Sequence, residues 1–405
     1  MKALRDLLDS IHPHVSKGGK FEKLGSLYEA VDTLAFSPGF QTRTGSHVRD
    51  GLDYKRMMFF VVNALVPCIL IGVWNTGYQA FSAIDAGAAP LADWQNALFQ
   101  ALGGSYDASN FLWCALFGLI YFAPIFLVVH VVGLGIEIIT AQIRGHDVTE
   151  GFLVTGMLLP LIMPPTIPLW QVAMGTAFGL IIGKEVFGGT GMNFMNPALV
   201  CRAFLFFSYP AQISGDAPWI AADHVGVDGF TGATLLAQAA VSESALHTAN
   251  WWAAFWGGIP GSMGETSAFA CLAGAGILIG TGIGSWRTIV GTALGTIVMA
   301  SFLNFVGSDT NPMFAVPWWW HMVLGGWAIG TVFMTTDPVS SSYTDAGRWV
   351  YGASIGALCV IIRSINPAYP EGMMLAILFM NMFAPLIDHF VVQRNIQRRL
   401  ARSGA

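Results

Sequence analysis

The sequence has 405 residues, of which 54% are hydrophobic and 11% are charged, and its mean hydropathy is +0.58. Soluble domains carry about 25% charged residues, so this composition excludes an ordinary soluble enzyme and gives no sign of a nucleic-acid-binding protein. The apolar residues occur in blocks long enough to cross a bilayer, which takes about 20 residues per helix. We therefore expect an all-α integral membrane protein.

The cations are concentrated at the two ends of the chain. Nine of the 19 Lys and Arg residues lie within residues 1–56, and four more are Arg394, Arg398, Arg399 and Arg402. No apolar core follows the first basic residues closely enough to form a signal peptide. We expect residues 1–56 to be a retained N-terminal segment outside the membrane and residues 392–405 to be a basic tail.

About ten apolar segments are candidate transmembrane helices. They are Met57–Trp74, Phe111–Ile136, Gly151–Trp170, Gln171–Val186, Pro197–Ile213, Ser267–Ile283, Trp286–Val306, Val316–Thr336, Trp349–Ile365 and Met373–Val391. The third contains Pro160, Pro164, Pro165 and Pro168. Because prolines leave backbone carbonyls without partners in lipid, we expect this segment to be a broken or half-inserted helix in the protein interior.

The charges between the spans indicate the orientation in the membrane. Residues 75–110, 203–286 and 307–317 contain no Lys or Arg, and all three stretches fall on the outer side if both basic termini are cytoplasmic. Arg363 is the exception, because it lies near an outer end. We expect its side chain to snorkel to the membrane surface.

Two tripeptides suggest an internal repeat. Asn196-Pro197-Ala198 and Asn366-Pro367-Ala368 precede the fifth and tenth spans. Five spans per half would give two inverted repeats, residues 57–213 and 267–391, joined by an outer connection at residues 214–266. Paired Asn-Pro-Ala motifs also occur in aquaporins, but ten spans and a separation of 170 residues argue against a six-span water channel.

The outer connection contains Asp228-Gly229-Phe230-Thr231-Gly232-Ala233-Thr234. Gly232 and Ala233 remove bulk beside the Thr234 hydroxyl, so a large group could approach it, and Asp228 could bind a metal or accept a proton. Composition alone favours a plain turn rich in Gly and Thr. The segment nevertheless resembles the Asp-x-x-Ser/Thr-Gly-Ala-Thr pattern at which flavin transferases attach FMN to the last threonine through a phosphoester.

That pattern is found in membrane subunits of the sodium-pumping NADH:quinone reductase and the related Rnf complex. The chain resembles the reductase's B subunits over nearly its whole length, on the segments 184–191, 193–199, 202–207, 307–311, 336–340, 366–374, 388–389 and 394–395. The resemblance implies a urea-transporter-like fold in a bacterial inner membrane, with covalent FMN on Thr234, a non-covalent riboflavin, ubiquinone reduction and Na⁺ export. It also implies partner subunits, including a flavin/NADH and iron–sulfur subunit.

The same resemblance implies roles for other residues. Glu137, Asp337 and Asp388 would serve the sodium path, although each could equally be a helix-end acid at the water interface. Gly133 and Gly135, near Glu137, would line the quinone site, although ordinary helix packing also explains such glycines. Asn193 and Asn196 offer amides that suit a riboflavin ring. We expect Glu185 to form a structural ion pair with Lys184, and the Trp318–His321 cluster to lie in an interfacial aromatic belt.

Two alternative functions remain open from the sequence. An Rnf-type ferredoxin:NAD oxidoreductase subunit would share the flavin motif but lack the quinone site. A urea-transporter-like channel would bind no flavin, and Thr234 would be only a loop residue.

The five cysteines lie in apolar runs without metal-ligand spacing, so we expect buried small residues and no metal, save one shared with another subunit. No dinucleotide-binding motif is present, which assigns NADH oxidation to a partner.

Overall fold

The structure is a computed structural model. It describes residues 2–16, 54–145, 151–224, 230–242, 244–366 and 372–403, together with residues 19, 25, 28, 32, 36, 45 and 227. Much of the N-terminal segment therefore lies outside the described residues, as do Asp228 and Gly229 of the flavin motif.

Within the part of the chain that the structure describes, five helices are long and apolar enough to cross a membrane. They are α3 (Tyr54–Asp85), α5 (Phe111–Arg144), α13 (Trp286–Val306), α16 (Asp345–Ile365) and α17 (Gly372–Ser403). Four shorter apolar helices lie among them: α6 (Gly151–Leu161), α7 (Leu169–Gly183), α8 (Pro197–Ser208) and α12 (Ala268–Gly280). The chain is thus an all-helical, multi-pass membrane protein.

The remaining elements are short. The α-helices are α1 (Lys2–Val15), α4 (Trp94–Ala101), α9 (Leu235–Val241), α10 (Ser244–Thr248), α11 (Trp251–Trp256), α14 (Trp318–Val323) and α15 (Trp327–Ile329). The 3₁₀ turns are η2 (Glu185–Phe187), η3 (Pro210–Gln212), η4 (Ala217–Trp219) and η5 (Pro312–Ala315), and η6 (Gly330–Met334) is a π-helix. The strands β1 (Ala89–Pro90) and β2 (Ala222–Asp223) pair antiparallel.

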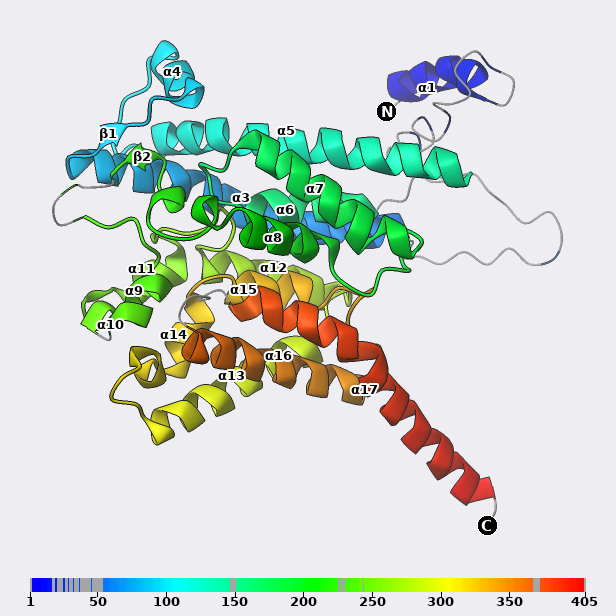
Figure 1. Cartoon of the computed structure of the whole chain (residues 1–405). Helices are drawn as coiled ribbons and strands as arrows, with labels where there is room; N and C mark the ends of the chain where they lie inside the picture. Colours follow the sequence, from blue (N-terminus) through cyan, green and yellow to red (C-terminus); the bar gives the residue numbers. More distant parts are fainter. Residues whose placement is uncertain are drawn as a thin grey trace.

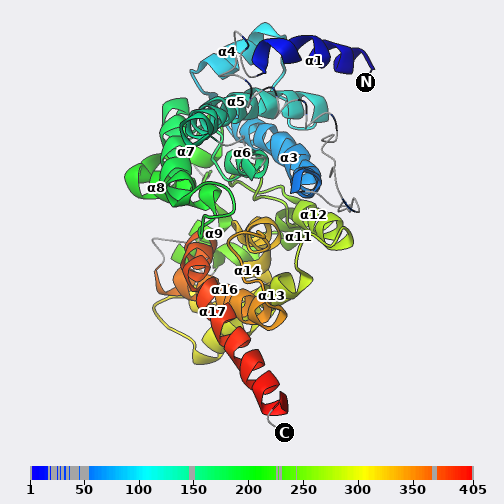
Figure 2. The same ribbon diagram turned by 90° about the vertical axis from the view of Figure 1, so that its right-hand side faces the viewer.

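The long helices run in one general direction, and several of the short elements lie at their ends (Figure 1). α4, the β1–β2 pair, α9 and α10 lie at one end, on the left of the figure. α1 and the last turns of α17 lie at the other. Turned by 90°, the helices form two groups, α3 and α5–α8 in one and α13–α17 in the other (Figure 2). α12 packs against α3 of the first group.

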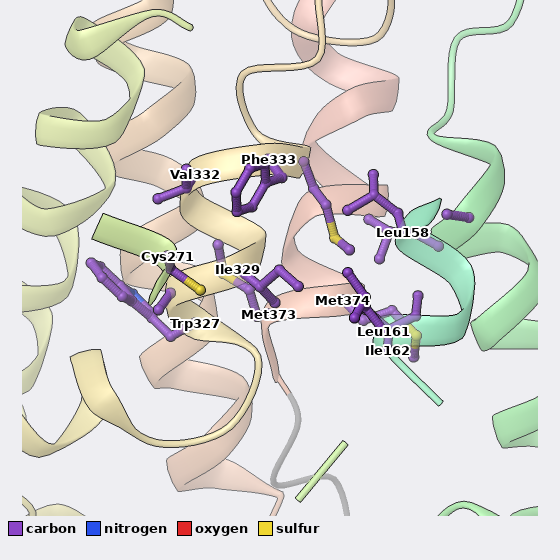
Figure 3. Packing of buried hydrophobic residues seen from close by; sticks show 14 of the residues in the cluster. Leu158, Leu161, Ile162, Cys271, Trp327, Ile329, Val332, Phe333, Met373 and Met374 are labelled. Atoms are coloured by element: carbon purple, nitrogen blue, oxygen red, sulfur yellow. The ribbon is translucent and has the colours of Figure 1, made fainter. Parts of the chain in front are cut away.

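A continuous apolar core joins the two groups (Figure 3). Leu158 and Leu161 of α6 lie opposite Met373 and Met374 of α17, and Phe333 of η6 lies close by. All five side chains are at most 5% exposed, so the broken segments of the chain pack against the long helix α17 in this core.

The proline-rich third span is broken, as expected. α6 ends at Leu161, and irregular backbone runs through the prolines to α7. The eighth segment, Val316–Thr336, was predicted only as a candidate span, and the structure divides it into α14, α15 and η6. α14 ends at Val323, and the chain is extended at Leu324 before it turns at Gly325, whose φ is +60°. Such a left-handed conformation suits glycine and interrupts a helix.

The predicted snorkelling of Arg363 is wrong, and the break explains why. Its side chain is 0% exposed and donates from Nη1 to the His321 carbonyl and from Nη2 to the Leu324 carbonyl, both at 2.8 Å. Breaking a membrane helix frees carbonyls that need donors. Arg363 therefore turns inward to supply those donors instead of reaching for the membrane surface.

The aromatic cluster next to the break is divided between surface and core. Trp319 is 45% exposed, in line with an interfacial belt, whereas Trp320 and His321 are buried. The belt prediction is wrong for these two residues, because the break turns α14 so that one of its faces packs into the protein.

Candidate functional site

Thr234 lies at the edge of a cavity at the α9 end of the molecule. It is the N-cap of α9, and its hydroxyl oxygen accepts a hydrogen bond from the Ala237 backbone N–H at 3.3 Å. We call this space the Thr234 cavity; its walls include Trp219, Thr234, Ser262, Glu265, Thr266 and Gly325. A group attached to the threonine hydroxyl could extend into it.

The residues before Thr234 form a turn that their own side chains hold in place. The Thr231 hydroxyl donates to Asp216 Oδ1 at 3.0 Å and accepts from the Ala233 N–H at 3.2 Å. A Cβ built on Gly232 would overlap the buried ring of His224 and lie 2.7 Å from the Asp216 carbonyl oxygen. Close packing therefore requires glycine at this position. The turn rich in Gly and Thr that composition alone favours is present, and its own contacts hold it in place.

The Thr234 cavity is lined by polar groups that the sequence analysis did not single out. Glu265 accepts from Arg202 Nη1 at 3.2 Å, and the same nitrogen donates to the Ser262 hydroxyl at 3.1 Å. The Thr266 hydroxyl is buried and has no hydrogen-bond partner among the described residues. Buried polar atoms are normally satisfied, so this hydroxyl is suited to bind a ligand. Arg202, an arginine inside an apolar span, is the one feature of the sequence that could have indicated these polar groups.

A second cavity lies at the opposite end of the helices. Its walls include Thr155, Lys184, Asn193, Asn196, Phe333 and Asp337, and we call it the Asn196 cavity. Asn196 caps α8 by accepting from the Ala198 and Leu199 N–H groups, and Asn193 Nδ2 donates to the Met195 carbonyl at 2.9 Å. The two predicted asparagines thus meet at one cavity, with a lysine and an aspartate beside them.

Comparison with known proteins places the chain in a family. A model of the NQR2, RnfD, RnfE family matches residues 41–397. The chain belongs to the NQR2, RnfD, RnfE family. The resemblance inferred from its motifs is therefore confirmed at the level of the family.

Individual relatives match over almost their whole length. The B subunit of the Na⁺-translocating NADH-quinone reductase of Pseudomonas aeruginosa is 53% identical over 99% of this chain and 100% of the relative. The subunits of the same name from Chromohalobacter salexigens and Neisseria meningitidis are each 53% identical over 99% of this chain, and the matches cover 97% and 99% of the relatives. The chain is thus similar in full to this subunit.

In this family member, Glu137 is a buried half of an ion pair. Lys184 Nζ contacts Glu137 Oε1, and both side chains are at most 4% exposed. Glu185 pairs instead with Arg144, whose Nη1 lies 3.1 Å from Glu185 Oε2. Glu185 thus forms a structural ion pair as predicted, but its partner is Arg144 and not Lys184, because the two adjacent side chains point in different directions and each meets a partner on α5.

Asp337 and Asp388 are both engaged by local donors. Asp337 accepts from the Ser340 hydroxyl at 2.7 Å and from the Val339 N–H at 3.1 Å. Asp388 accepts from the Ser342 and Thr344 hydroxyls and from the Tyr343 and Thr344 N–H groups, at 2.6 to 3.0 Å. Asp337 lines the Asn196 cavity, whereas Asp388 ties α17 to the segment before α16.

The two predicted quinone-site glycines of α5 lie in different surroundings. A Cβ on Gly133 would overlap the Phe152 ring and lie 3.2 Å from Leu180 Cδ1, so this glycine allows close contact with α6 and α7. A Cβ on Gly135 would meet nothing within 4 Å. The structure does not bring the two to one surface, and their part in quinone binding stays a prediction.

The cysteines are buried, as expected. All five are free, and Cys68 Sγ lies 3.8 Å from Cys271 Sγ without a disulfide. Across the described residues, no group of three or more His, Cys, Asp or Glu side chains is arranged to hold a metal ion.

Proposed function

We propose that this chain is the B subunit of a Na⁺-translocating NADH:quinone reductase, carrying electrons through the membrane to ubiquinone in steps coupled to Na⁺ export. The observation that carries the proposal is the Thr234 hydroxyl at the edge of a cavity with polar groups in its wall, within a chain 53% identical to subunits of that name. The names of these relatives favour the reductase over the Rnf complex, and a flavin-free channel would need no such threonine.

Thr234 is the proposed attachment point of FMN. A flavin transferase would join the threonine oxygen to the FMN phosphate, using the motif residues Asp228, Thr231, Gly232 and Ala233, and the flavin would accept and pass on electrons. The fit is supported by the cavity beside Thr234 and by the Thr266 hydroxyl, which has no partner among the described residues. Thr231 and Gly232 would keep the hydroxyl accessible by holding the turn.

Riboflavin is proposed to bind in the Asn196 cavity. Asn193 and Asn196 border it, and each amide uses part of its hydrogen-bonding capacity on the backbone. Each amide has four hydrogen-bonding positions, which leaves capacity for a ligand.

The sodium path is proposed to involve Glu137, Asp337 and Asp388, and quinone to be reduced near Gly133, Gly135 and Glu137. Carboxylate oxygens suit a hard cation such as Na⁺. Lys184, which contacts Glu137 and borders the same cavity as Asp337, links two of these acids. For this path to carry Na⁺, the Glu137–Lys184 contact would have to open.

We also propose that the two groups of helices are inverted repeats with a urea-transporter-like fold, spanning residues 57–213 and 267–391. In support, α7 packs against both α5 and α8, and α16 packs in the same way against both α13 and α17. Each group also contains one broken segment. The outer connection 214–266 would carry Thr234, and segments 1–56 and 392–405 would be cytoplasmic.

The protein would function only inside a complex in the bacterial inner membrane. A partner subunit with flavin and an iron–sulfur centre would oxidise NADH and supply the electrons. The other proposed partners are ubiquinone, the lipid bilayer and the flavin transferase. No nucleic acid is proposed as a partner.

The decisive experiment is a denaturing gel of the purified protein under ultraviolet light, beside a Thr234→Ala variant. Fluorescence that survives denaturation and disappears in the variant supports covalent FMN at Thr234. A dark wild-type band, from a host that expresses the flavin transferase, contradicts the proposal and favours the channel. Quinone-dependent NADH oxidation by the purified complex then separates the reductase from an Rnf-type enzyme.

A further inference from the structure

Arg363 is a buried charge that the proposed function does not yet use. It lies near the end of α16, and its side chain is 0% exposed. Among the residues that the structure describes, no carboxylate forms an ion pair with it, whereas Arg202 pairs with Glu265. Burying a guanidinium without a counter-charge is costly, so its retention needs a reason.

The hydrogen bonds of Arg363 explain its position but not its charge. Nη1 and Nη2 donate to the His321 and Leu324 carbonyls, which the break after α14 leaves without helical partners. A neutral amide side chain could donate to the same carbonyls without bringing a charge into the core. The positive charge is therefore available to act on another group nearby.

The nearest candidate is the Thr234 cavity. Leu324 and Gly325 form part of its wall, and a Cβ on Gly325 would lie 3.2 Å from Arg363 Nη2. The guanidinium thus lies directly behind a residue that has no side chain. Across the cavity, the charge of Glu265 is balanced by Arg202 at 3.2 Å. Asp216, which accepts from Thr231, is another described charge near the cavity, but it lies beside the Thr231 turn, whereas Arg363 lies behind Gly325 without an ion-pair partner among the described residues.

We propose that Arg363 gives the Thr234 cavity a positive potential that stabilises the group at Thr234 in its reduced, more negatively charged state. The proposal rests on the proposed function. Electrons from NADH, delivered by the partner subunits, add negative charge to the flavin, and proton uptake offsets only part of it. In the low dielectric of a buried site a nearby cation favours that state strongly. In this proposal, Arg363 acts on the flavin at Thr234 through its positive charge, as a positioning residue.

The test is a redox titration of the purified complex, with the signal of the Thr234-bound flavin obtained by subtracting the trace of a Thr234→Ala complex. Arg363→Gln should lower the midpoint potential, so that the ratio of reduced to oxidised flavin at a fixed ambient potential falls about tenfold. Arg363→Lys keeps the charge and should restore most of the ratio. Equal losses in both variants would mean that geometry matters rather than charge, and would overturn the proposal.

A second pair of variants tests the charge while leaving Arg363 in place. Cys359 is fully buried one turn before Arg363 on α16, so Cys359→Asp would put a carboxylate beside the guanidinium and neutralise it. We expect a lower midpoint potential of the Thr234-bound flavin in Cys359→Asp. The neutral control Cys359→Asn should keep the wild-type midpoint potential. If the Arg363→Gln complex does not assemble, the comparison of Cys359→Asp with Cys359→Asn decides whether the charge of Arg363 sets the potential.

The two proposals fail in different ways. A wild-type band without covalent fluorescence would contradict the flavin at Thr234 itself. A fluorescent band with the same midpoint potential in wild type, Arg363→Gln and Cys359→Asp would leave the flavin in place and overturn the role of Arg363.

Discussion

At the scale of single residues, the Glu137–Lys184 pair has the clearest energetic consequence. Both side chains are almost completely buried, so removing one leaves the other charge without compensation in the core. Glu137→Gln or Lys184→Met alone should destabilise the protein by about 3–5 kcal/mol, and the double variant by clearly less. Thermal denaturation of the purified complex, arranged as a double-mutant cycle, measures this coupling.

The outcome bears on the sodium path as well. If Glu137 serves only to take up Na⁺, the single variants should lose Na⁺-dependent turnover while keeping wild-type stability. Additive, small changes in stability would therefore contradict a structural ion pair.

Gly232 gives a second prediction at this scale. A methyl group there would overlap the His224 ring and crowd the Asp216 carbonyl, so Gly232→Ala should move the turn that presents Thr234. We expect most of the covalent flavin fluorescence to be lost. Thr231→Ser keeps the hydroxyl that accepts from the Ala233 N–H and should retain the fluorescence. Normal fluorescence in Gly232→Ala would show that the turn tolerates this displacement.

At the scale of elements, α5 offers a matched pair of glycines. Gly133 packs against Phe152 and Leu180, whereas the space beside Gly135 is open. Gly133→Ala should therefore destabilise the protein by about 1–3 kcal/mol through overpacking. Gly135→Ala should change stability by about 0.5 kcal/mol or less, as is usual for sites without such contacts.

A compensating change distinguishes packing from quinone binding. Phe152→Leu should recover part of the stability lost in Gly133→Ala, because it removes the ring that the new methyl group meets. If Gly133→Ala instead keeps full stability and only raises the KM for quinone, the glycine acts in the binding site.

At the scale of the whole molecule, the arrangement predicts on which side of the membrane each end lies. α9, whose N-cap is Thr234, lies at the end of the helices opposite the last turns of α17 (Figure 1). The native cysteines are all buried, so an introduced exposed cysteine can be labelled selectively. Val241 at the end of α9 is 83% exposed, and Arg402 is exposed on α17.

In intact cells, a membrane-impermeant thiol reagent should label Val241→Cys and leave Arg402→Cys unlabelled until the membrane is opened. The reverse pattern would place Thr234 in the cytoplasm. That result would contradict both the assignment from the basic termini and the attachment of flavin from outside.

The sequence by itself determined the membrane class, the family and several spans. Trp286–Val306 was predicted with the bounds that α13 has, because Ser285 caps its start and Gly307 ends it. These features depend on local composition, on continuous apolar runs and on short motifs, all of which can be read along the chain. That Asn193 and Asn196 border the same cavity was also predictable this way, since both residues lie in one short segment.

Only the tertiary structure decided which charges meet and where the eighth span breaks. Glu137 finds Lys184 across 47 residues, and Arg363 reaches the carbonyls of His321 and Leu324 about forty residues before it in the chain. Span 316–336 has enough apolar residues for a continuous helix, so composition could not reveal its break. A broken helix is stable only where another element supplies donors to the freed carbonyls, and that element is known only once the chain has folded.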